Sequence, residues 1–439
     1  MEGKGYNLRI SILETLIMKI ETEIKLYKKT KKIIYNTFEK IKNDYHVALQ
    51  IGDFIDKVMR MEDKGEIKRE YEMFIKKQIS ENIKYGDIFN MDLNCLSSDK
   101  VSYNIRAIGN IDKYIPDVAA EKIYQMQEAL KCSGEKVIVN SILYFEQYFC
   151  TILRTLIYKK PEAYLYGKEL KFSDIVNKDF EKLKCDLVEE CVSNLMHGVA
   201  ETINKVNKIH DLKLDKYSDI WNSYIEADLH RNIIMHNNGE INNEYLNKLP
   251  NNKGELKVGT YLKCDDNCIY AKTNNIIKFA YLLLYLIGNN DEDFVILQKS
   301  AFDFLKKEQW ELAEFCYNLL MKIKNINYDI KMDFNINRLN AKKHLVGMEK
   351  ARKEIENLDV SGMNDSYLIA KELLLENNEN IIKLLETNYP NVFGSYHIES
   401  WPIFIEFRKS DEYKRFREEH KKDFELHEYK INQTPDIAC

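Results

Sequence analysis

Very few helix-breaking residues interrupt this chain. Its 439 residues include only 16 glycines and six prolines, and long straight-chain side chains, which lose little rotamer freedom in a helix, are abundant. We therefore predict a mainly α fold. The hydrophobic share of 45% is enough to form real cores, and the length predicts two or three domains rather than one.

The pattern of apolar residues divides the chain into four regions. Helical periodicity weakens over about 85–118, and the rhythm of the helices changes near 290. We therefore predict the following organisation: a helical N-terminal region of unknown role over 1–130, a helical bundle over 131–290, an α-α repeat array over 291–425, and a tail over 426–439.

The middle region should contain a long central helix over 137–158, one or two helices over 180–209, and another over 217–236. The apolar run 276–287 has about half the length needed to cross a bilayer, so it predicts a buried helix. Around the turn-like triplet at 265–267, β-branched and aromatic residues predict a small β-hairpin over 255–271.

The third region repeats a small residue followed four positions later by a large one. Ala313 precedes Tyr317, and Ala351, which lies 38 positions beyond Ala313, precedes Ile355. A period near 34–40 is typical of stacked helix–turn–helix repeats, in which alanine allows close helix approach. The region resembles tetratricopeptide-like repeats, with 398–416 as a capping end. That resemblance implies a concave surface for a protein partner.

Charge and cysteine content narrow the classes of function. The net charge of -5 gives no global case for nucleic-acid binding, so any basic site must be local. The lysine cluster at 25–32 indicates either a solvated helix face or an RNA-backbone contact. Nine scattered cysteines, Cys264 and Cys268 among them, lack the spacing of a zinc site and are interpreted as ordinary reduced thiols. Together with these reduced cysteines, the absence of an apolar N-terminal segment predicts a cytoplasmic protein with no membrane partner. The sequence has no P-loop, G-x-G-x-x-G or H-E-x-x-H motif, so no cofactor is expected.

The segment "RNIIMHNNGEINNEYL", residues 231–246, carries the candidate chemistry. Arg231 and His236 lie five positions apart near a predicted helix end, with Gly239 as the stop signal. In mid-helix the two side chains would diverge by about 140°, whereas in a last turn they could face one cleft. Two simpler interpretations remain open, namely that both residues complement the helix dipole, or that the spacing is accidental.

The wider segment resembles the signature of the HEPN superfamily, whose nuclease members carry an R-x(4–6)-H motif. The residues that carry the resemblance are Arg231-Asn232-x-x-x-His236-Asn237-x-Gly239-x-Ile241-Asn242-x-x-Tyr245-Leu246. The resemblance implies a metal-independent endoribonuclease that acts on RNA as a homodimer, with two motifs forming one composite cleft. It also implies a role as a toxin or an anti-phage defence effector.

Each motif residue then has an expected role. An imidazole can exchange a proton near neutral pH, so His236 would act on the ribose 2′-OH or the leaving oxygen. Arg231 would bind phosphate oxygens, and Asn232 would position His236, the dimer mate or the substrate. His230 is expected on the surface. Alanine at Arg231 or His236 is expected to abolish cleavage with little loss of stability.

Two other classes of function remain open. The same helices could serve as a non-enzymatic dimeric adaptor in which the motif is structural. Alternatively, the protein could be a regulator that binds RNA without cutting it.

Overall fold

The computed structural model describes residues 12–37, 116–169, 179–250, 256–288 and 291–425, together with two short strands and a few single positions between 57 and 73. This described part is mainly helical, as predicted. None of its helices is long and apolar enough to cross a membrane.

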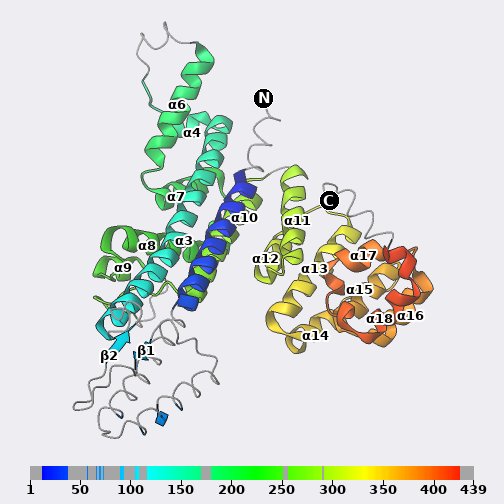
Figure 1. Cartoon of the computed structure of the whole chain (residues 1–439). Helices are drawn as coiled ribbons and strands as arrows, with labels where there is room; N and C mark the ends of the chain where they lie inside the picture. Colours follow the sequence, from blue (N-terminus) through cyan, green and yellow to red (C-terminus); the bar gives the residue numbers. More distant parts are fainter. Residues whose placement is uncertain are drawn as a thin grey trace.

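Before residue 290, the chain forms an elongated bundle (Figure 1). Its elements are a helix over 12–37, β1 (Phe89–Asp92), β2 (Asn104–Ala107), α3 (Pro116–Lys159), α4 (Pro161–Leu165), α6 (Phe180–Leu195), α7 (Val199–His210), the 3-10 turn η3 (Leu214–Tyr217), α8 (Ser218–Asn237), α9 (Asn243–Lys248) and α10 (Asp266–Ile287).

The centre of the bundle is an aromatic cluster shared by α3, α8 and α10. The ring centroids of Phe145 and Tyr224 lie 4.7 Å apart, and those of Tyr224 and Phe279 lie 4.5 Å apart. All three side chains are fully buried. The helix predicted over 137–158 is therefore central, as expected, and it fixes the position of α8 through direct packing.

The helix over 12–37 belongs to the same core. Its apolar face, which includes Leu13, Leu16 and Ile20, is buried against α3 and α10 (Figure 1). The Tyr27 hydroxyl donates a hydrogen bond to Asp266 over 2.8 Å, and the Lys307 ammonium lies 2.9 Å from Glu21. This helix thus contacts both α10 and the loop that follows α11.

Beyond residue 290 the helices form consecutive pairs that curve away from the bundle (Figure 1). They are α11 (Asp291–Lys306), α12 (Trp310–Leu320), α13 (Tyr328–Val346), α14 (Met348–Glu356), α15 (Asp365–Leu375), α16 (Asn378–Asn388), α17 (Ser395–Ser400) and α18 (Asp411–Glu419), with 3-10 turns η4 (Pro402–Phe404) and η5 (Phe407–Lys409) before α18.

The small and large residues of the alanine pattern are buried in these helices. Ala313 and Ala351 are fully buried, and so are Tyr317 and Ile355, the large residues that follow them. The first helices of successive pairs are in contact, α11 with α13 and α13 with α15. The resemblance to tetratricopeptide-like repeats stays a prediction.

The hydrophobic core divides the chain differently from the predicted boundaries. Helix α3 continues through residue 130 without a break. The first core extends past residue 290 and includes α11, α12 and part of α13, while a second core begins on the other side of α13 and continues to α18. Described helices on both sides of 290 therefore share one core, and α3 runs through 130. The predicted domain limits stay a prediction.

The β-hairpin predicted over 255–271 is wrong. The Asp265 side chain accepts a hydrogen bond from the Cys268 backbone N–H at 2.9 Å, so the triplet at 265–267 starts α10 instead of making a turn. The residues before it pair with the loop after α8, where Glu240 and Tyr261 form an isolated bridge. The antiparallel pair that the structure does describe, β1 with β2, lies elsewhere.

Candidate functional site

Helix α8 ends as its sequence predicts. It spans Ser218–Asn237, close to the predicted 217–236. Asn238 and Gly239 then take positive φ angles of 51° and 76°, and the Gly239 N–H closes the end by donating to the Ile233 carbonyl at 3.0 Å. The Asn237 amide donates to the Glu240 carbonyl, so this polar run shapes the turn.

The chain then folds back so that α9 packs against the end of α8. The Ile241 N–H donates to the Thr260 carbonyl at 2.8 Å, which fixes the returning strand-like segment. The Asn242 side chain caps α9 by accepting from the Tyr245 N–H at 2.8 Å. A small apolar cluster that includes Ile233 and Tyr245 joins the two helices.

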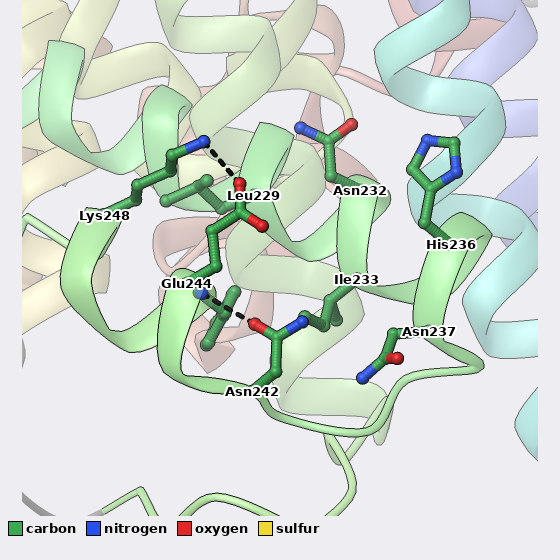
Figure 2. A pocket seen from close by; sticks show the side chains of 9 residues that line it. Leu229, Asn232, Ile233, His236, Asn237, Asn242, Glu244 and Lys248 are labelled. Atoms are coloured by element: carbon green, nitrogen blue, oxygen red, sulfur yellow. Dashed lines mark hydrogen bonds and ion pairs between the residues drawn. The ribbon is translucent and has the colours of Figure 1, made fainter.

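An open pocket of about 360 Å³ lies between α8 and α9 (Figure 2). Both apolar and polar side chains line it. The lining residues are Leu229, Asn232, Ile233, His236, Asn237, Asn242, Glu244, Tyr245 and Lys248.

Asn232 and His236 meet in this pocket because they lie one helical turn apart. Residues four positions apart share a face of a helix, and both side chains project from α8 into the same space (Figure 2). His236 is exposed, and no residue in the described part of the chain forms a hydrogen bond or ion pair with its side chain. The pocket therefore offers an imidazole and an amide side by side.

The opposite wall adds a charged pair that the sequence interpretation did not include. Lys248 donates to Glu244 over 2.8 Å, at the i, i+4 spacing of α9. This hydrogen bond lowers the pKa of the Glu244 carboxyl and raises the pKa of the Lys248 ammonium. Both side chains are solvent-exposed, so the pair can open at little cost and free the ammonium for an anion.

Arg231 does not line the pocket. Because α8 stays regular through Asn237, the five steps to His236 turn the two side chains about 140° apart. The guanidinium Nη2 instead donates to Glu146 on α3 and to Asp228, each over 2.7 Å. The structure thus brings Asn232 and His236 together and places Arg231 on the α3 side of the helix.

The two carboxylates around Arg231 are only partly exposed, with 21% of the Glu146 side chain and 15% of the Asp228 side chain accessible. Burial raises the pKa of the Glu146 carboxyl, an effect that Arg231 opposes and Asp228 reinforces. The guanidinium is therefore needed to balance two neighbouring negative charges between α3 and α8. Its geometry indicates a structural contribution in the single chain.

His230 is buried, with 6% of its surface exposed, so its predicted surface position is wrong. Its Nδ1 lies 3.0 Å from the Glu226 carbonyl and 3.1 Å from the Tyr245 hydroxyl. Helical periodicity correctly predicts that His230 points away from Arg231. It cannot predict that α9 covers that face of α8.

Replacing Arg231 by alanine should lower the free energy of unfolding by about 1–3 kcal/mol, because two half-buried carboxylates lose their shared partner. This revises the expectation of unchanged stability. Denaturant unfolding of the full chain measures the loss, and Arg154→Ala is the matched control. Arg154 pairs with Glu189 at a more exposed site, where about 1 kcal/mol or less is expected.

If Arg231→Ala is no less stable than Arg154→Ala, the structural assignment of Arg231 fails. The double variant Arg231→Ala with Glu146→Gln adds a check. Removing one of the stranded negative charges should restore part of the lost stability.

Within the described ranges, no group of three or more His, Cys, Asp or Glu side chains is arranged to hold a metal ion. Comparison with protein-family models, with curated proteins and with solved structures gave no match to this chain.

Proposed function

We propose that this protein is a metal-independent endoribonuclease of the HEPN type, with the α8–α9 pocket as its catalytic cleft. The observation that carries the proposal is the joint placement of Asn232 and His236 in one open pocket. The R-x4-H resemblance of residues 231–236 supplies the reaction class. Lys248 adds a cation within the same pocket.

The proposed reaction is an internal displacement at phosphorus. The ribose 2′-oxygen attacks the adjacent phosphorus, the bond from phosphorus to the 5′-oxygen breaks, and the products carry a 2′,3′-cyclic phosphate and a 5′-hydroxyl. His236 takes the proton from the 2′-OH or gives one to the leaving oxygen. The Asn232 amide and the Lys248 ammonium bind phosphate oxygens as negative charge develops.

One imidazole serves only one of the two proton transfers at a time. We therefore propose a two-fold dimer in which two copies of α8 approach each other and each supplies one His236. Both carboxylates around Arg231 accept from Nη2, and no described residue accepts from Nη1. That nitrogen is left for a phosphate at such an interface.

The direct experiment uses the purified full-length protein and total RNA in the presence of EDTA. Cleavage should persist, and the products should carry cyclic phosphate and 5′-hydroxyl ends. Loss of cleavage with EDTA, or 5′-phosphate ends, would rule out the proposed reaction. Light scattering tests the dimer, since a fully active monomer at micromolar concentration would contradict the composite cleft.

Arg231 also supports a second candidate function. Its commitment to Glu146 and Asp228 is what a non-enzymatic helical adaptor would need to hold α8 against α3. In that case the helix pairs α11 to α16 would bind a protein partner. A protein that dimerises and neither binds nor cleaves RNA would favour the adaptor, whereas RNA binding without cleavage would favour an RNA-binding regulator.

The biological role follows the reaction. If the protein cleaves RNA in cells, its expression should arrest growth, as a toxin or an anti-phage effector would. The C-terminal helix pairs are then the proposed surface for a partner that controls this activity.

A further inference from the structure

A cluster of titratable side chains lies behind the pocket, between α8, α9 and α10. His230 is at its centre, and its Nδ1 is held by the Glu226 carbonyl and the Tyr245 hydroxyl. Because a carbonyl can only accept, Nδ1 carries a proton, and a neutral ring keeps its acceptor lone pair on Nε2. The base is therefore both buried and oriented, which is the arrangement that activates a nucleophile.

The nucleophile beside this histidine is Cys268, in the first turn of α10. Its thiol is within hydrogen-bonding reach of the Cys264 thiol and of the His230 ring. The hydrogen bond from Cys264 lowers the pKa of Cys268 most, followed by the hydrogen bond and charge of His230 and by the charge of Lys272. The helix N-terminus also favours a thiolate at this position.

The pKa of the second thiol, that of Cys264, is shifted in the opposite direction. The hydrogen bond to Cys268 and burial both raise the pKa of Cys264, and Glu135 on α3 adds to this. The backbone of Cys264 packs closely against Gly134 of α3. A Cβ added at Gly134 would lie only 2.7 Å from the Cys264 carbonyl oxygen. Both thiols are partly accessible to solvent.

We propose that Cys264 and Cys268 form a redox-active dithiol that reacts with peroxides. The two thiols are adjacent, one faces an oriented histidine at a helix N-terminus, and both are partly exposed. This site is independent of RNA cleavage and does not rest on the proposed nuclease function.

The chemistry proceeds in two steps. The Cys268 thiol gives its proton to Nε2 of His230 and its sulfur attacks one oxygen of hydrogen peroxide; the O–O bond breaks, and the departing hydroxide takes that proton back from His230 to form water. Cys264 then attacks the sulfur of the Cys268 sulfenic acid, a disulfide forms, and the released hydroxide takes the Cys264 proton as a second water. The dithiol loses two electrons, which reduce the peroxide.

The test uses the full-length protein and an equimolar amount of hydrogen peroxide. After a short reaction, free thiols are alkylated and each cysteine is quantified by peptide mass spectrometry. We expect a Cys264–Cys268 disulfide that dithiothreitol reverses. Cys132 and Cys185 are the internal controls, because both are exposed, and Cys268 should be oxidised about tenfold faster than either.

Two variants separate the attacking thiol from the resolving thiol. In Cys264→Ser, a sulfenic acid should accumulate on Cys268 and be trapped by dimedone. In Cys268→Ser, Cys264 should remain reduced under the same conditions. The proposal is overturned if Cys132 and Cys185 are oxidised first in the unmodified protein, or if the trapped sulfenic acid forms on Cys264.

Discussion

Replacing His236 by alanine should lower the rate of RNA cleavage by about 10²–10⁴-fold, the usual contribution of a proton-transfer group. The unfolding midpoint should hardly change, because the side chain is exposed and no described residue bonds to it. The measurement compares cleavage rates of one defined RNA by the two proteins, with thermal unfolding recorded on the same samples.

The matched control is His197→Ala. His197 is also exposed but lies outside the pocket, in the turn between α6 and α7. The His197→Ala variant should cleave RNA like the unmodified protein. Equal activity of the His236 variant and the His197 variant would remove His236 from the reaction, and with it the assignment of the pocket.

Ending the chain at Asn290 should prevent stable folding. α11 and α12 cover α10, with Phe304 edge-on to Tyr281 at 5.6 Å and the Asn274 amide donating to Glu311 over 2.8 Å. Each large apolar side chain contributes about 1.5–3 kcal/mol when buried. The summed free energy of burial of the apolar side chains in α11 and α12 therefore exceeds the free energy of unfolding of a typical protein, about 5–15 kcal/mol.

The truncated chain should therefore aggregate, or show no cooperative unfolding transition by circular dichroism. A chain ending at Glu425 is the control for shortening itself, since it keeps every described helix, and it should unfold like the full protein. A soluble, cooperatively folded chain ending at Asn290 would show that the bundle is independent of α11 and α12.

The sequence by itself determined the elements that depend on local interactions. The limits of α8 follow from Gly239, which accepts the positive φ that a helix end requires. Ala313 shares the buried face of its helix with Tyr317, and Ala351 shares that of its helix with Ile355, because residues four positions apart lie on the same face. The mainly α class follows from the scarcity of helix breakers.

Tertiary structure decided everything that depends on which faces meet. His230 is buried because α9 covers it. Arg231 is held by a hydrogen bond to Glu146, which is 85 residues away in sequence. The local sequence at 265–267 fits either a turn or a helix cap. In the folded chain Asp265 caps α10, and the neighbouring Cys264 packs against Gly134. Periodicity gives the direction of a side chain from its own helix, whereas its partners depend on long-range packing that no local pattern encodes.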